Sequence, residues 1–138
     1  MKKIPETENA AIIRTDFTDD SKWQSLVETV SEERDFSIFN MTILDDHTFD
    51  GKSVEELLKM IPEDYPHAFL MIADADAINQ TDHPIVVVDL LDDRGKQFRA
   101  IANCVSAIDS NLSIGNMGFE EFANCVDDAG VHRGFPDM

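Results

Sequence analysis

Short apolar runs rich in β-branched residues recur along the chain, and they predict β-strands. The run IVVVDLL at residues 85–91 is apolar enough to suit a strand in the middle of a sheet. The turn at 92–96, which contains Gly95, predicts an antiparallel hairpin between this strand and the next one. The predicted strands occupy residues 10–17, 36–44, 68–73, 85–91 and 97–102.

Apolar residues three and four positions apart predict three helices, two between these strands and one after them. The first helix follows Thr18, which is a suitable N-cap. The second opens with the capping box S-x-x-E, formed by Ser53 and Glu56. The third begins near Phe119, and Gly130 is well placed to end it.

The order of these elements predicts an α/β fold: a single mixed β-sheet of about five strands, covered by three or four helices. Helices between the first three strands argue for parallel crossovers, whereas the later links are too short for a crossover helix. With 138 residues the chain is expected to form one domain. Residues 1–9 are interpreted as a flexible N-terminal lead-in, and residues 10–138 as the single α/β domain.

The charge balance is strongly acidic, because 11 Lys and Arg residues stand against 28 Asp and Glu residues, a net charge of −17. A field of this sign repels phosphate backbones, so no direct binding to nucleic acid is expected. The same field attracts cationic surfaces, so a basic protein is the partner that the charge favours. The alternative is that the charge serves solubility alone.

Several features favour a cytoplasmic location. The sequence has no run of about 18 apolar residues, so no membrane span is expected. Residues 1–10 lack the apolar stretch of a secretory signal. Cys104 and Cys125 lack the spacing of metal ligands, and we expect them to be thiols in a reducing compartment. The sequence does not indicate an oligomeric state.

Three carboxylates near the ends of predicted strands form a candidate metal site: Asp16, Asp74 and Asp89. Ligands of open α/β sheets usually lie at the carboxyl ends of the strands, and converging carboxylates suit Mg²⁺. The alternative is structural, with these acids serving as helix caps, turn residues or solvated side chains. Asp89 lies within an apolar run and would be costly to bury alone, so Arg14 or Arg99 could be its structural partner.

Two segments near the end of the chain are candidates for ligand contacts. Residues 103–118 are ambiguous, with a short helix near 105–108 followed by an irregular loop. Asn111 and Asn116 in this segment suit turns and backbone-like hydrogen bonds. Arg133, after the last helix, is placed to meet an acid. These three residues form a candidate binding loop, and a packed structural loop is the alternative.

Most of the chain, from Ala11 to Phe135, carries four distinctive motifs: IIRTDFTDDSKW (12–23), IVVVDL (85–90), NLSIGNMGFEEFA (111–123) and GVHRGF (130–135). Together these motifs resemble a family of small bacterial domains of unknown function. That family has no assigned activity, so the resemblance implies a bacterial, cytoplasmic α/β domain and no catalytic role. Its members more often carry Ala and Asp where this chain has Gly115 and Gly118.

Two functional hypotheses follow from these observations. The sequence contains no phosphate-binding glycine motif and no nucleophile elbow, so no cofactor and no catalytic set are expected. The favoured hypothesis is therefore a non-enzymatic protein-binding or inhibitory module, similar in principle to immunity proteins that neutralise toxins. The alternative is a metal-dependent enzyme that uses Asp16, Asp74 and Asp89 as ligands.

Overall fold

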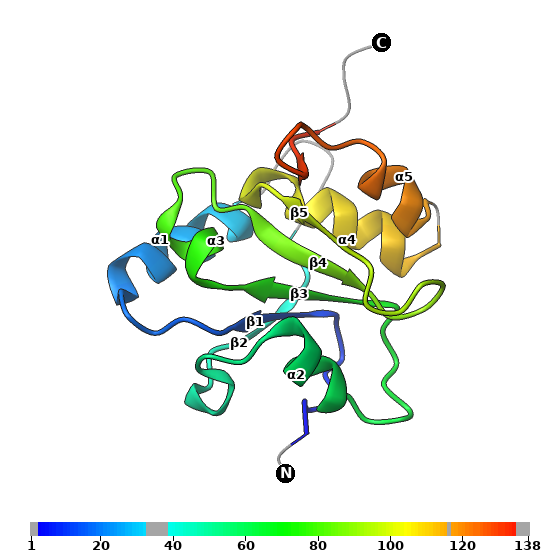
Figure 1. The fold of residues 1–138 in the computed structure, drawn as a ribbon, viewed down its shortest axis with the longest axis horizontal. Coiled ribbons are helices and arrows are strands. Elements are labelled where there is room, and N and C mark those ends of the chain that lie inside the picture. Colours follow the sequence, from blue (N-terminus) through cyan, green and yellow to red (C-terminus); the bar gives the residue numbers. More distant parts are fainter. Residues whose placement is uncertain (1–2, 33–38, 116, 135–138) are drawn as a thin grey trace.

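The computed structural model describes residues 3–32, 39–115 and 117–134. The strands in this part of the chain are β1 (Ala11–Arg14), β2 (Thr42–Leu44), β3 (Phe69–Ala73), β4 (Ile85–Asp89), β5 (Gln97–Ala100) and β6 (Val131–His132). These six strands form one mixed sheet in the order β2-β1-β3-β4-β5-β6 (Figure 1). β1 is parallel to β2 and β3, β4 is antiparallel to both β3 and β5, and β6 is parallel to β5.

The α-helices of the described residues cover both faces of the sheet. They are α1 (Asp20–Ser31), α2 (Val54–Lys59), α3 (Ala75–Asn79), α4 (Val105–Ser113) and α5 (Phe119–Ala123). α2 packs on one face, and α1, α3, α4 and α5 pack on the other (Figure 1). The predicted α/β fold with one mixed sheet is therefore confirmed, and the described residues form six strands in place of about five and five α-helices in place of three or four. No helix in this part of the chain is long and apolar enough to cross a membrane.

Side-chain alternation along the central strands builds two separate hydrophobic cores. In β3, Phe69 and Met71 enter the core beneath α1, α3, α4 and α5, whereas Leu70 and Ile72 enter the core beneath α2. Every residue of β3 and β4 is buried, which explains why these strands appear in the sequence as continuous apolar runs.

Side-chain hydrogen bonds cap the N-termini of α1 and α2. The predicted capping box of α2 is confirmed: the Glu56 amide donates to Ser53 Oγ at 3.1 Å, and the Ser53 amide donates to Glu56 Oε1 at 3.2 Å. At α1 the cap is Asp19, which accepts hydrogen bonds from the amides of Ser21 and Lys22. The prediction that Thr18 caps this helix is therefore wrong by one residue.

The boundaries of several elements differ from the sequence predictions. α3 and β6 are additional elements, and α4 is longer than the short helix predicted near 105–108. α5 ends at Ala123, earlier than predicted, because the Asp127 side chain and main chain form a turn that directs the chain back into β6. The strands are also shorter than predicted, and residues 36–38 of the predicted second strand lie outside the described residues.

The segment before β1 lies against the domain. Ile4 is almost completely buried and belongs to the core beneath α2. Its amide donates to the carbonyl oxygen of Met60 at 2.8 Å. Further along, the His67 ring nitrogen Nε2 lies 2.7 Å from the carbonyl oxygen of Thr7. Ile4 and Thr7 of the predicted lead-in therefore contact the domain, whereas Pro5, Glu6 and Glu8 are exposed.

Candidate functional site

Asp16 and Asp74 follow two neighbouring parallel strands, β1 and β3, at the same edge of the sheet. The Thr18 hydroxyl donates to Asp16 at 3.0 Å. Asp74 caps α3 by accepting from the Ala77 amide, and it also pairs with Arg99, with Nη2 and Oδ2 separated by 2.7 Å. Asp74 raises the pKa of the Arg99 guanidinium through this interaction. The structural alternative for these acids, capping and local hydrogen bonding, describes their contacts.

Asp89 lies at the opposite edge of the sheet, because β4 runs antiparallel to β3. It stands directly opposite Phe69, the first residue of β3, whereas Asp74 follows the last residue of that strand. The five residues of β3 separate the two edges by roughly 16 Å. Asp89 is buried, and its carboxylate accepts from the amides of Leu91 at 3.0 Å and Asp93 at 2.9 Å.

The prediction that Asp16, Asp74 and Asp89 converge on one metal ion is therefore wrong. The physical reason is the reversal of chain direction between β3 and β4, which carries Asp89 away from the other two acids. In the described ranges, no group of three or more His, Cys, Asp or Glu side chains is arranged to hold a metal ion. The suggested pairing of Asp89 with an arginine is also wrong, because turn amides occupy its carboxylate.

The candidate binding loop of Asn111, Asn116 and Arg133 does not form one site in the described residues. Asn111 lies in α4, where its side-chain amide donates to the Ala107 carbonyl at 2.8 Å. Asn116 lies outside the described residues. Arg133 follows β6 and meets acids as predicted, donating to Asp127 at 2.8 Å and to Asp82 at 2.9 Å. Its hydrogen bond lowers the pKa of Asp127.

A buried arginine organises the edge of the sheet at the end of β1. The Arg14 guanidinium carbon lies 4.3 Å from the centroid of the Phe17 ring and 5.0 Å from that of Trp23. Its nitrogens contact Asp20 at 2.7 Å and Asp45 at 3.2 Å. Arg14 thus lies against two aromatic rings and forms ion pairs with two carboxylates from different segments.

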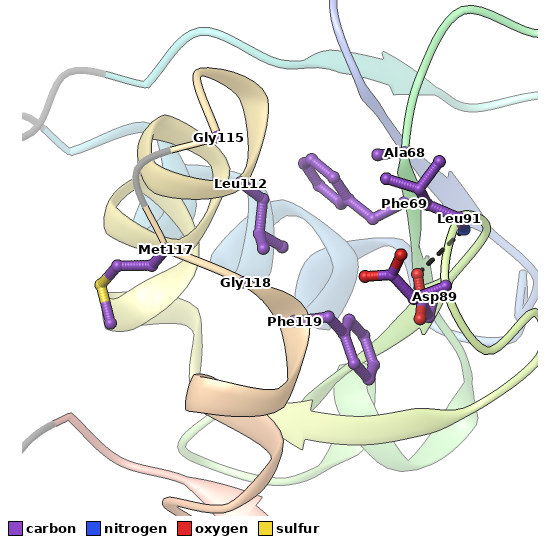
Figure 2. Close-up of a pocket in the computed structure, with 10 residues that line it drawn as sticks. Ala68, Phe69, Asp89, Leu91, Leu112, Gly115, Met117, Gly118 and Phe119 are labelled. Carbon is purple, nitrogen blue, oxygen red and sulfur yellow. Dashed lines mark hydrogen bonds between the residues drawn. The ribbon is translucent and has the colours of Figure 1, made fainter.

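A pocket of about 160 Å³ lies where the start of β3 and the end of β4 meet the connection between α4 and α5 (Figure 2). Phe69 and Asp89 are paired in the sheet register, so their side chains project from the same face. Leu112 of α4 and Phe119 of α5 extend into the same space (Figure 2). The other lining residues are Ala68, Leu91, Asp92, Gly115, Met117 and Gly118.

The charged groups that line this pocket are both acidic. They are Asp89 and Asp92, and none of the residues described as lining the pocket is basic. Two cations lie in the nearby β4–β5 turn, but both are directed elsewhere. Arg94 Nη2 donates to a backbone carbonyl of α2 at 3.4 Å, and Lys96 Nζ lies 2.6 Å from Glu120. Glu120 raises the pKa of Lys96, which keeps this ammonium group charged.

Comparison with known families agrees with the resemblance that the sequence motifs indicate. A family whose description is "Domain of unknown function (DUF6924)" matches residues 9–135. The chain belongs to the DUF6924 family. The expected membership of an uncharacterised family of small domains is thereby confirmed. No curated protein matches the chain.

The sequence motifs of this DUF6924 chain contribute to two places in its fold. The first, around Arg14, supplies the guanidinium, the Phe17 and Trp23 rings and the Asp20 carboxylate of one cluster. The second and third, IVVVDL and NLSIGNMGF, are distant in sequence but line the same pocket. Asp89 is marked in the sequence by its position within an apolar run, whereas Asp92 and Phe69 carry no local signal of a site.

A serine–histidine pair between α1 and the α3–β4 connection was not predicted either. Ser25 Oγ lies 3.2 Å from His83 Nε2, and His83 Nδ1 lies 2.9 Å from the Ala77 carbonyl oxygen. His83 has a φ of 50°, a strained conformation for a residue with a side chain. A carbonyl and not a carboxylate faces Nδ1, so this contact lacks the charge that stabilises an imidazolium in hydrolytic triads. The pair ties α1 to α3.

Proposed function

We propose that this protein is a non-catalytic binding module that engages the positively charged surface of another protein. The observation that carries the proposal is the large surplus of acidic side chains, 28 against 11 basic ones. Among the described residues, at least five of the basic side chains lie within ion-pair distance of carboxylates of the same chain: Arg14, Lys52, Lys96, Arg99 and Arg133. The remaining acids therefore dominate the field at the surface.

An acidic field favours encounter with a basic protein and disfavours nucleic acid, whose phosphates it repels. Covering a basic functional surface would inhibit the partner, and this inhibitory, immunity-like mode is the finer form of the proposal. A cytoplasmic location in a bacterium belongs to the same proposal.

The alternative, a metal-dependent enzyme, required three carboxylates in one site. Asp89 lies at the other edge of the sheet from Asp16 and Asp74, so that site has no geometric support. We therefore do not propose it.

The test begins with capture of partners on the immobilised full-length chain, with elution in rising salt. A captured protein is then purified, and its affinity is measured by calorimetry at about 50 and about 300 mM NaCl. We expect a basic protein, saturable 1:1 binding, and a Kd that rises at least about tenfold over this range. A neutral or acidic partner, a salt-independent Kd, or no saturable binding would contradict the proposal.

A further inference from the structure

We infer that the pocket between β3, β4, α4 and α5 receives one arginine side chain of the basic protein partner. This inference rests on the proposed function and adds the site and the chemistry of recognition. Three features of the pocket carry it: its size, its mixed apolar and acidic lining, and the exposed apolar residues beside it.

The size of the pocket suits a single side chain. Its volume is about 160 Å³, and a cavity of about 150 Å³ admits a molecule of the size of benzene. Phe69, Leu112 and Phe119 provide an apolar wall against which the aliphatic part of an arginine can pack (Figure 2). Aromatic rings in this wall also suit a planar guanidinium better than a compact ammonium group.

The charge of the pocket is complementary to a cation. Asp92 is exposed, and no described residue donates a hydrogen bond to its carboxylate, so it is available as an ion-pair partner. Asp89 adds a second negative charge, although two of its acceptor positions are already taken by turn amides. Arg94 and Lys96, the two cations of the adjacent turn, make their direct contacts with a backbone carbonyl of α2 and with Glu120. Lys96 also attracts Asp89 electrostatically, but no ion pair of the described residues joins either cation to Asp92.

The chain already uses the same combination internally. Arg14 lies against two aromatic rings while its nitrogens bind the carboxylates of Asp20 and Asp45. The pocket offers two aromatic rings and two carboxylates without a basic residue of its own. A cation that contacts both rings and Asp92 would therefore come from outside the chain.

The surroundings of the pocket favour a protein over a small solute as the source of that cation. Leu91 is 71% exposed and lines the pocket, and Ile114 is 78% exposed and directly precedes the lining residue Gly115. Large apolar side chains exposed beside a pocket are typical of protein contact surfaces. An arginine inserted from a partner would bring its neighbouring residues onto these two side chains.

The test uses NMR titration of the isotope-labelled full-length chain in low salt with the peptide acetyl-Ala-Arg-Ala-amide. The control peptide contains citrulline, which has nearly the shape of arginine without its charge. We expect saturable shifts at the amides of Leu91, Asp92, Gly118 and Phe119 with a Kd of about 1–10 mM, and no saturable shift with citrulline. Shifts scattered over the acidic surface, equal binding of both peptides, or no saturation would overturn the inference.

Two variants that each remove one negative charge distinguish binding in the pocket from attraction by the overall acidic surface. Asp92→Asn is expected to weaken the arginine peptide at least about fivefold, whereas Glu28→Gln on exposed α1, which removes the same charge, should change the Kd by less than about twofold. Equal effects of the two variants would overturn the inference.

Failure of the inferred arginine pocket is distinguishable from failure of the proposed function. A salt-sensitive basic partner whose affinity is unchanged by Asp92→Asn would overturn the pocket alone. A partner that is not basic would overturn the proposed function even where the peptide occupies the pocket.

Discussion

Arg99 and Asp74 form a two-point ion pair, with Nη1 to Oδ1 at 3.0 Å and Nη2 to Oδ2 at 2.7 Å. Arg99 belongs to β5 and Asp74 follows β3, so the pair spans the intervening strand β4. Asp74 also caps α3, and Arg99 also donates to the Pro84 carbonyl at 2.8 Å. One carboxylate therefore joins a helix start to a strand two positions away in the sheet.

Replacement of Asp74 tests how much this junction contributes to stability. Asp74→Ala is expected to lower the free energy of unfolding by about 2 kcal/mol, because it removes a helix cap and a partly exposed ion pair together. The matched control is Asp76→Ala, since Asp76 is 69% exposed and lies 3.7 Å from the same guanidinium. Its cost should stay below about 0.5 kcal/mol. Urea denaturation measures both values, and equal costs would contradict a special role of Asp74.

Arg14 provides a second stability test, and Trp23, the only tryptophan of the chain, reports on it directly. Arg14→Met should lower the free energy of unfolding by about 2–3 kcal/mol, because ring contacts and charged hydrogen bonds are lost together. Arg14→Lys should recover only part of this, since an ammonium group does not reproduce the planar donor set. Unfolding in urea is followed by Trp23 fluorescence, with Lys22→Met on exposed α1 as control. A lysine variant as stable as the original chain would contradict the account.

Local signals in the sequence predicted much of the fold, and their success has a physical basis. The Ser53–Glu56 box and the apolar runs of β3 and β4 depend on neighbouring residues and on burial, so they are visible in the sequence. α3 gives little signal in the sequence because it has only five residues and its N-cap, Asp74, also fits the pattern of a metal ligand at a strand end. β6 gives none because two residues carry no periodicity.

The candidate site was less predictable, since it depends on which edge of the sheet each residue reaches. The short links after β3 predicted a reversal of chain direction, and this same reversal places Asp89 opposite Phe69, away from Asp74. The pocket combines β3, β4 and the α4–α5 connection, which are distant in sequence. Asp92 there is one of many exposed acids, so nothing local distinguishes it.

Asp109 gives a prediction of pH dependence. Burial raises the pKa of this carboxyl, and the hydrogen bond from Ser113 and the attraction of His67 oppose the shift only in part. Above the ordinary pKa of an aspartate, the folded state binds more protons here than the unfolded state, up to the raised folded pKa. The contribution of Asp109 to stability therefore falls as pH rises through that window.

Asp109→Asn removes this pH-dependent penalty. The variant should gain stability relative to the original chain as pH rises from about 4 to about 7, with the smallest difference at the acidic end. Chemical denaturation at a series of pH values measures the difference, and Asp128→Asn at an exposed position serves as control. A difference that is constant with pH, or that falls toward neutrality, would contradict the raised pKa.

Replacement of Asp89 tests whether its carboxylate stabilises the β4–β5 turn. Its two oxygens accept from the amides of Leu91 and Asp93 and so hold the start of the β4–β5 turn. Asp89→Ala should lower the free energy of unfolding by about 2–3 kcal/mol, because two hydrogen bonds to a charged group are lost. Asp89→Asn retains one acceptor oxygen and should cost about half as much.

The matched control is Asp92→Ala, in the same turn but exposed and without a described hydrogen bond, with an expected cost below about 0.5 kcal/mol. Hydrogen exchange separates the local effect from a global one. The amides of Leu91 and Asp93 should exchange faster in Asp89→Ala before those of β1 are affected, because the lost bonds belong to the turn. Unchanged exchange at these two amides would show that another group holds the turn, and Asp89 would then need a different reason for its burial.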